Sequence, residues 1–231
     1  MKSTLSYVGR FAAAIRSPFR HPRDQLDRLD YFSGLGDSAY LLYGLARALK
    51  PKTAVEIGSA RGKSACFLGL ALKENGSGKL YAIDPHAPTA WNDLESTDTI
   101  EDMRRNISAL GLEQIVEIVR TTSGEAVRTW ARPIDLLFID GDHSFDGVKS
   151  DWDSFSPFVT EFGLVVFHDT MWDRSPDERY QRPDMGVPAF VESLRAEGYP
   201  VITLDKDHGV SVVQPKHGGV SLAPSLPNAA K

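Results

Sequence analysis

The sequence predicts an α/β fold in which a seven-stranded, mostly parallel sheet carries helices on both faces. From residue 53 to residue 168, short apolar runs typical of buried strands alternate with segments of helical periodicity, and this alternation indicates a parallel sheet. The last two predicted strands are joined by only four residues, which suit an antiparallel hairpin and not a helical crossover. The 231 residues, 42% of them hydrophobic, suffice for one domain with a buried core and exclude a mainly disordered chain.

A helix is expected before the first strand. Asp37 is a favourable N-cap residue, apolar side chains recur at helical spacing from Tyr40 to Leu49, and Pro51 prevents the helix from continuing. Five strands with helices between them follow. In chain order these are strand 53–58, helix 62–73, strand 79–84, helix 98–110, strand 115–119, helix 124–131, strand 134–140, helix 145–155 and strand 163–168.

The chain after residue 168 has a different pattern. Residues 170–188 are polar, contain three prolines and predict a long loop of the kind that often covers a site. A helix at 188–197 is followed by the two hairpin strands, 200–204 and 209–213. Five parallel strands closed by an antiparallel hairpin resemble the layout of the Rossmann-like class I methyltransferase fold, and this resemblance implies the strand order 3-2-1-4-5-7-6. Fold alone does not establish function.

Composition and charge exclude several classes of protein. A single cysteine cannot form an internal disulfide or a cysteine-based zinc site, and it favours a reducing, cytoplasmic setting. The net charge of -5 argues against nucleic-acid binding, which requires clustered lysine and arginine. No apolar run approaches the ~18–20 residues of a membrane span, so we expect no stable insertion into a membrane.

Charge is distributed unevenly along the chain. Residues 1–30 carry six basic and three acidic side chains, a net charge of +3, so the remaining residues carry -8. We therefore divide the sequence into a basic N-terminal extension (1–36), one α/β domain (37–214) and a disordered tail rich in proline and glycine (215–231). Because of the extension, we expect a homodimer.

A glycine turn joins the first predicted strand to the following helix in the segment VEIGSARGKS, residues 55–64. Glycine lets the backbone turn sharply and approach a ligand, and a helix N-terminus offers free N–H groups. The spacing from Gly58 to Gly62 is one residue too short for a phosphate-binding P-loop, and Ala60 replaces the second glycine of a dinucleotide fingerprint. The remaining pattern, E-x-G-x-x-x-G, resembles the loop that S-adenosylmethionine enzymes use.

Other residues near this turn could contact the same cofactor. Glu56 could accept hydrogen bonds from an ammonium group or from the loop, and Asp84, at the end of the second strand, could accept hydrogen bonds from both ribose hydroxyls. Ser123 could contact the adenine, or it could be the N-cap of the next helix. The predicted cofactor-binding residues are Glu56, Gly58, Ser59, Gly62, Ser64, Asp84, Ser123 and Asp140.

The fourth and fifth predicted strands each end in acidic and histidine residues. Parallel strands open at one edge of the sheet, where folds of this class bind ligands, so these side chains should converge. They are Asp140, Asp142, His143, His168 and Asp169. Carboxylates with an imidazole suit a hard divalent cation such as Mg²⁺ or Mn²⁺. Asp142 could instead cap the following helix.

Residues 53–213 resemble the methyltransferase-domain family that includes macrocin-type sugar O-methyltransferases, relatives of the catechol and caffeoyl-CoA O-methyltransferases. The resemblance is carried by the segments VEIGSARGKS, LYAIDP, DLLFIDGDHSFDGVKSDWDSF and GLVVFHDTMW. It implies an S-adenosylmethionine-dependent O-methyltransferase that acts on a hydroxyl group of a small molecule, such as a sugar or a polyphenol, with Mg²⁺ or another divalent cation.

The resemblance also implies roles for the strand-end residues. In the metal-dependent members an Asp ends the fourth strand, a Lys base lies three residues further on, and an acidic-Asp or Asp-Asn pair ends the fifth strand. Asp140 and His143 match the first two positions as catalytic residues, and Asp140, His168 and Asp169 are the implied metal ligands. His168 departs from the pattern because it replaces a carboxylate, so a metal could bind more weakly, differ in identity or be absent.

Two alternatives stay open. The first keeps the cofactor site without a metal and uses His143 and His168 as an acid/base pair, because imidazole titrates near neutral pH. The second is a non-catalytic binding module with the basic extension as its contact surface. Two loops, 85–97 with Trp91 and 170–188, are expected to shape the substrate pocket. Their sequences do not identify the substrate.

Overall fold

The computed structural model describes residues 22–29, 31, 33–88, 91, 99–172 and 182–216. The chain divides into two units, Met1–Asp30 and Tyr31–Lys231. In the described part of the first unit there is one short helix, α1 (Pro22–Leu26). Most of the predicted N-terminal extension and the predicted tail from residue 217 onward lie outside the described residues. No helix in the described ranges has the length and hydrophobicity needed to cross a membrane.

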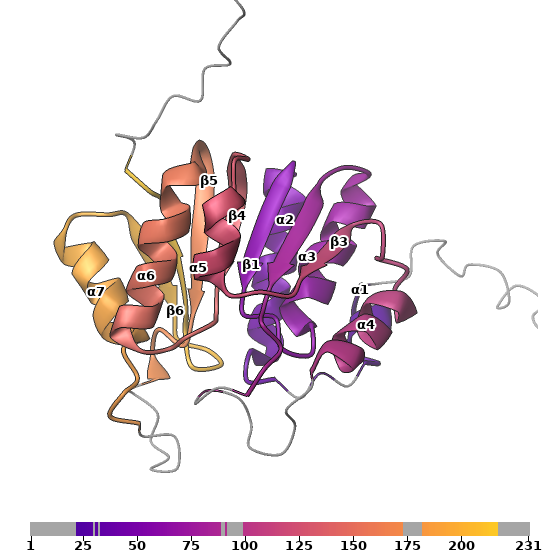
Figure 1. Ribbon diagram of the computed structural model, residues 1–231, viewed down its shortest axis with the longest axis horizontal. Coiled ribbons are helices and arrows are strands. Elements are labelled where there is room, and N and C mark those ends of the chain that lie inside the picture. The colour runs from indigo at the N-terminus through magenta and orange to yellow at the C-terminus, as the bar shows by residue number, and fades with distance from the viewer. Residues whose placement is uncertain are drawn as a thin grey trace, which may run out of the picture. The chain divides into compact units, whose positions relative to one another are not determined.

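A seven-stranded sheet forms the centre of the second unit (Figure 1), and its order is β3-β2-β1-β4-β5-β7-β6. The five strands β1 to β5 pair in parallel, whereas β7 pairs antiparallel with both β5 and β6. The predicted fold class and strand order are therefore confirmed. The strands are β1 (Thr53–Ile57), β2 (Lys79–Ile83), β3 (Val116–Val119), β4 (Ile134–Ile139), β5 (Val159–His168), β6 (Val201–Leu204) and β7 (Val210–Val213).

Helices cover both faces of this sheet. In Figure 1, α2 and α3 lie behind the sheet, and α5, α6 and α7 lie in front of it. Helix α3 is buried along most of its length, because it packs on the sheet and is covered by α2. The helices are α2 (Ala39–Leu49), α3 (Lys63–Asn75), α4 (Ile100–Ala109), α5 (Ser123–Ala126), α6 (Phe145–Phe155) and α7 (Val187–Ala196), with short 3-10 turns η1 (Gly36–Ser38), η2 (Val127–Thr129) and η3 (Ser156–Phe158).

The start of α2 differs from the sequence-based expectation. Asp37 lies within the 3-10 turn η1, does not cap the helix, and receives a hydrogen bond from Lys206 Nζ at 2.8 Å. The backbone N–H and the hydroxyl of Ser38 both donate to the carboxylate of Asp207, at 2.8 and 3.0 Å. A backbone N–H at the start of the helix thus donates to a carboxylate from a distant part of the chain. A capping rule based on neighbouring residues cannot predict such a contact.

Two further boundaries differ. The expected helix 124–131 is divided into α5 and η2, and β5 begins at Val159 instead of residue 163. The extra strand residues pair with the start of β4 across a register shift between Ile134 and Leu136. Such an irregularity lets β5 continue past its glycine, Gly163, at which a Cβ would lie 2.6 Å from Val159 Cγ1.

The core on the front face is rich in aromatic side chains. Phe167 in β5 is fully buried, and its ring centroid lies 5.8 Å from that of Trp152 in α6 and 5.9 Å from that of Phe190 in α7. Aromatic contacts of this kind contribute beyond the area they bury. This cluster holds α6 and α7 on the sheet and so fixes the carboxyl end of β5.

We expect the substitution Phe167→Ala to lower the free energy of unfolding by about 3–5 kcal/mol, because it leaves a cavity in the core. Urea denaturation measures this change. Phe162→Ala is the matched control, because the Phe162 side chain on the same strand is 79% exposed. The control should change stability by less than about 0.5 kcal/mol. Equal losses in the two variants would contradict this account of the core.

Candidate active site

The β1–α3 loop packs directly against the end of β4. Gly58 has a φ of 85°, and a Cβ at this position would lie 2.1 Å from the carbonyl oxygen of Asp140. Gly58 N donates to Ile83 O at 2.9 Å, and Asp140 N donates to Ile57 O at 2.8 Å. Gly62 ends the loop with a φ of 81°. Glycine at position 58 therefore brings the ends of β1, β2 and β4 into contact.

Asp84 organises this loop with its carboxylate. Its Oδ2 accepts hydrogen bonds from Ser59 N at 2.8 Å and Ala60 N at 2.9 Å, and its Oδ1 accepts one from His86 N at 2.6 Å. Ala60 has a φ of 41°, in the left-handed region that residues with a side chain seldom adopt. The strained loop is thus held from the end of β2, and Oδ1 keeps capacity for a further donor.

Glu56 is a fully buried carboxyl group beneath the loop. Its Oε2 accepts a hydrogen bond from Ser59 Oγ at 2.8 Å, and its buried Oε1 has no hydrogen-bond partner among the described residues. Burial raises the pKa of Glu56 to about 8, although the nearby hydroxyls of Ser64 and Ser59 lower it. An acceptor oxygen without a donor is costly inside a protein, so this position suits a ligand that brings a donor.

The predicted residues after β4 and β5 form one cluster. His168 Nδ1 lies 3.1 Å from Asp140 Oδ1 and 3.2 Å from Asp169 Oδ1. His143 Nε2 lies 3.5 Å from Asp140 Oδ1, and its Nδ1 lies 3.1 Å from Asp169 Oδ2. Each imidazole therefore bridges both carboxylates, as the predicted convergence requires. Asp142 is not part of this cluster. Its Oδ1 accepts a hydrogen bond from Ser144 N, just before α6, at 2.9 Å.

The charges of the cluster shift its pKa values. Burial lowers the pKa of His168, but Asp140 and Asp169 outweigh it and raise that pKa to about 9. Burial raises the pKa of Asp140, but the charge of His168 and hydrogen bonds from both histidines bring it down to about 2. The pKa of His143 is raised by the same carboxylates against the effect of burial. Asp169 is more deeply buried than Asp140, and its pKa is raised because burial outweighs the two histidines.

His168 is held from its other side by a residue that the sequence pattern did not single out. Its Nε2 lies 2.9 Å from the carbonyl oxygen of Asp207, in the turn between β6 and β7. Both ring nitrogens of His168 thus face oxygen acceptors, which favours the doubly protonated imidazolium. No signal in the sequence marks a residue that acts through its backbone carbonyl.

The cluster has the donor set of a metal site. Within the described ranges, Asp140, His143 and Asp169 each offer one ligand atom, and these atoms lie within 4.8 Å of one another. Two carboxylate oxygens and one imidazole nitrogen suit Mg²⁺, Mn²⁺ and similar divalent cations. The group includes His143, expected to be the base, and not His168, expected to be a ligand.

Ser123 makes a contact other than the two expected for it. Its hydroxyl donates to Asp151 Oδ1 in α6 at 2.5 Å. The N-cap of α5 is Thr122, whose side chain accepts a hydrogen bond from Glu125 N at 3.2 Å. The alternative role of Ser123 as an N-cap is therefore wrong, and Asp151 joins the residues near the candidate cofactor site.

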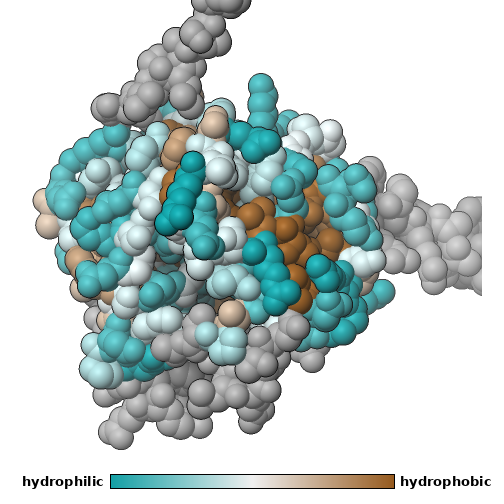
Figure 2. Space-filling view, viewed as in Figure 1, coloured by the Kyte–Doolittle hydropathy of each residue, from teal (hydrophilic) through white to brown (hydrophobic). Residues whose placement is uncertain are grey.

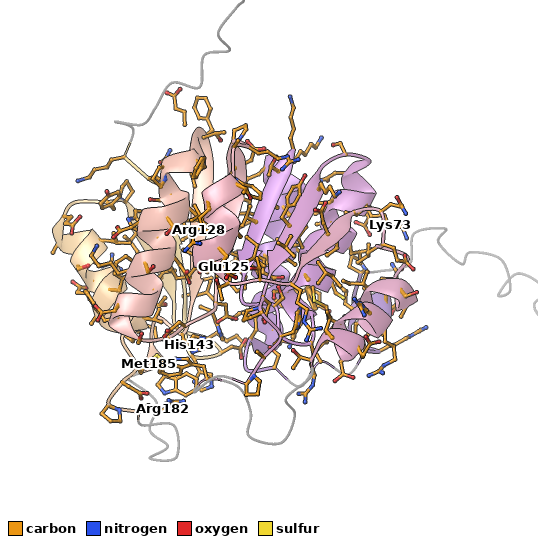
Figure 3. The ribbon with its side chains drawn as sticks, in the orientation of Figure 1. Lys73, Glu125, Arg128, His143, Arg182 and Met185 are labelled. Carbon is orange, nitrogen blue, oxygen red and sulfur yellow. The ribbon has the colours of Figure 1, made fainter. Side chains whose placement is uncertain are left out.

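Aromatic and basic side chains surround His143. The Trp91 and His143 ring centroids lie 5.1 Å apart, and the Arg182 guanidinium lies 3.8 Å from the Trp91 centroid. Gly186 N donates to His143 O at 2.8 Å. Figure 3 shows His143 and Arg182 at the same edge of the sheet, together with Met185. The two loops expected to shape a pocket therefore both reach the cluster.

A separate groove of about 250 Å³ lies beside β2 and β3 and reaches the last residue of each strand, Ile83 and Val119. It runs along β2, β3 and η2, and apolar surface is visible on this face in Figure 2. Its aromatic lining residues are Tyr81 and Trp130, whose rings meet edge to face at 5.1 Å. None of the predicted site residues lines it, so the groove is distinct from the glycine loop and the histidine–carboxylate cluster.

The fold and its strand-end site define a class I methyltransferase. Residues 55–170, about half of the chain, match the family model described as a methyltransferase domain, and the chain belongs to this family. The matched segment includes the glycine loop, Asp84 and every member of the histidine–carboxylate cluster. The predicted methyltransferase family is thereby confirmed.

Two relatives match parts of the chain. The uncharacterized protein y4gI of Sinorhizobium fredii is 28% identical in an alignment of 169 positions that covers 65% of this chain and 18% of that protein. The uncharacterized protein R132 of Acanthamoeba polyphaga mimivirus is 30% identical in an alignment of 123 positions that covers 51% of each chain. The chain thus matches less than a fifth of the first relative and about half of the second.

Solved structures share the fold. The S-adenosylhomocysteine-bound methyltransferase PaMTH1 of Podospora anserina has a TM-score of 0.61 and 15% identity, over 78% of both chains. An O-methyltransferase of Bacillus cereus in complex with S-adenosylhomocysteine has a TM-score of 0.58 and 16% identity, over 87% of this chain and 94% of that chain. The O-methyltransferase TomG of Streptomyces achromogenes, in complex with S-adenosylmethionine, has a TM-score of 0.60 and 19% identity, over 84% and 85%.

We expect the substitution Glu56→Gln to flatten the pH dependence of stability. Glu56 keeps its proton up to about pH 8 in the folded protein but only to about 4.5 when unfolded, so the free energy of unfolding falls as the pH rises between these values. The full difference corresponds to about 5 kcal/mol, and glutamine removes it. Urea denaturation from pH 5 to pH 8.5 measures the slope.

The exposed residue Glu161 offers a control for the change in net charge. Glu161→Gln removes one negative charge at the surface and should leave the wild-type slope nearly intact. An unchanged slope in Glu56→Gln would show that Glu56 is not a buried acid of raised pKa.

Proposed function

We propose that this protein transfers a methyl group from S-adenosylmethionine to a hydroxyl group of a small molecule, such as a sugar or a polyphenol, with the assistance of a divalent cation. The observation that supports the proposal is the direct packing of the glycine loop on Asp140, so that the loop lies beside the histidine–carboxylate cluster. The cofactor supplies an electrophilic methyl group on a positively charged sulfur. The protein's contribution is to position the hydroxyl oxygen and remove its proton.

The loop residues fit S-adenosylmethionine. Glu56 Oε1, buried without a donor, suits an ammonium group, and such a charge would lower the pKa of Glu56 again. Asp84 Oδ1 has capacity left for a ribose hydroxyl. We propose that the cofactor is bound by the full predicted set, Glu56, Gly58, Ser59, Gly62, Ser64, Asp84, Ser123 and Asp140.

The cluster fits a divalent cation. Asp140, His143 and Asp169 would hold it, and it would lower the pKa of the acceptor hydroxyl so that no strong base is needed. His168 is better suited to orient the two carboxylates than to bind the ion, because its Nε2 is held by the Asp207 carbonyl, whereas both nitrogens of His143 face only the two carboxylates of the candidate metal group.

A metal-free version is supported by one observation. The imidazolium of His168 already bridges Asp140 and Asp169, at 3.1 and 3.2 Å, and supplies the positive charge that those carboxylates require. In that version His143 takes the proton of the hydroxyl, and the two carboxylates stabilise the imidazolium that forms. His168 then provides a fixed charge and is not the acid partner in proton transfer.

Calorimetry with S-adenosylmethionine tests the cofactor site. We expect the wild-type protein to bind it, and Asp84→Asn to weaken binding at least about tenfold, because the substitution disturbs the loop and the ribose contact together. Asp205→Asn, at an exposed position in the β6–β7 turn, is the control and should bind normally. The absence of binding by the wild-type protein at millimolar ligand would contradict the proposal.

An assay of methyl transfer to a panel of sugars and polyphenols tests the cluster. The release of S-adenosylhomocysteine measures turnover. His143→Ala and Asp140→Asn should each reduce turnover at least about 100-fold in either version. Loss of activity with a chelator, restored by Mg²⁺ or Mn²⁺, would support the metal-assisted version, and activity that resists the chelator would support the metal-free one. Cofactor binding without transfer to any acceptor would favour the non-catalytic module.

A further inference from the structure

Asp151, in α6, is a buried carboxyl group that the proposed reaction does not use. Its residue exposure is 4%, and its Oδ1 accepts a hydrogen bond from Ser123 Oγ at 2.5 Å. No described residue donates a hydrogen bond to its Oδ2, and no described basic side chain forms an ion pair with it. Buried carboxylates are usually paired, so this one calls for a reason.

Asp151 lies close to the glycine loop. A Cβ added to Gly141 would lie 3.5 Å from Asp151 Oδ2 and 3.8 Å from Gly58 N. Gly141 follows β4 and Gly58 follows β1, and these strands are neighbours at the point where the strand order changes direction. Sheets of this type bind nucleotides at that point. The free oxygen of Asp151 therefore lies close to the expected nucleotide position.

The carboxylate is kept there at a cost to stability. Burial raises the pKa of Asp151 to about 6, the hydrogen bond from Ser123 lowers it, and the nearby charge of Asp142 raises it further. A donor brought by a ligand would offset this cost. The ligand group that fits is a hydrogen-bond donor, because an ionised carboxylate only accepts.

Adenine has one donor group on its base, the N6 amino group, and its ring nitrogens N1, N3 and N7 are acceptors. Ser123, which holds Asp151, follows β3, at the end of the site where the adenine is expected. We propose that Asp151 accepts a hydrogen bond from the N6 amino group of the cofactor's adenine and thereby selects adenine over a 6-oxo purine. This inference rests on the proposed use of S-adenosylmethionine.

The test compares S-adenosylhomocysteine with S-inosylhomocysteine, in which an oxygen replaces the N6 amino group. Calorimetry on the full chain at about pH 8, where Asp151 is ionised, should show that the wild-type protein binds the adenosyl compound at least about 30-fold more tightly, because O6 would face a carboxylate without a proton between them. In Asp151→Asn the amide can donate to O6, so the ratio of the two dissociation constants should fall to about threefold or less.

The matched control is Asp153→Asn, on the same helix, where the aspartate is exposed and pairs with Lys149. It should keep the wild-type ratio. Ser123→Ala removes the hydroxyl that orients Asp151 and should also reduce the ratio, which provides a second test if Asp151→Asn does not fold.

The outcomes separate this inference from the proposed function. A wild-type protein that binds neither compound would overturn both. A protein that binds S-adenosylhomocysteine but accepts the inosyl compound equally well would overturn only the inference about Asp151. The same holds if Asp151→Asn, or Ser123→Ala in its place, keeps the wild-type ratio.

Discussion

Two carboxylates at the ends of neighbouring parallel strands are stable only with positive charge beside them, and this requirement shapes the carboxyl edge of the sheet. Asp140 and Asp169 are bridged twice, by His143 and by His168. Removal of a charge from water costs several kcal/mol unless an opposite charge and hydrogen bonds compensate it. Asp169 even adopts a left-handed backbone, with a φ of 60°, in making these contacts, and strain of this kind is common at functional sites.

The same requirement connects the antiparallel hairpin to the cluster. An imidazolium needs an acceptor at each nitrogen, and the second acceptor of His168 is the Asp207 carbonyl in the β6–β7 turn. The carboxylate of Asp207 in turn accepts two hydrogen bonds from Ser38 at the start of α2. The hairpin, which distinguishes this sheet from an ordinary dinucleotide-binding sheet, thus fixes a charged group of the site as well as closing the sheet.

The sequence allowed most of the fold and the members of the cluster to be predicted, because both depend on local patterns. Buried parallel strands are continuous apolar runs, and polar residues that follow them must meet at one edge. The contacts of Asp207 and Asp151 could not be predicted, since they join residues 39 and 28 positions apart through a carbonyl and a hydroxyl. The roles of His143 and His168 were likewise open, because they depend on which ring nitrogens already face oxygen atoms.

Glu56 and Asp151 are related by the same physical argument. Each is a buried acid whose pKa is raised by burial, and each accepts a hydrogen bond from a serine hydroxyl on one oxygen. The other oxygen of Glu56 is buried without a hydrogen-bond partner in the described part of the chain. Gly141, just after β4, lies close to both Asp151 Oδ2 and Gly58 N in the glycine loop that follows Glu56. The proposed cofactor has an ammonium group at one end and an amino group at the other. A ligand with donors at both ends would satisfy both acids at once, and its binding would favour their ionised forms, so cofactor binding and proton release are linked at the two ends of the site.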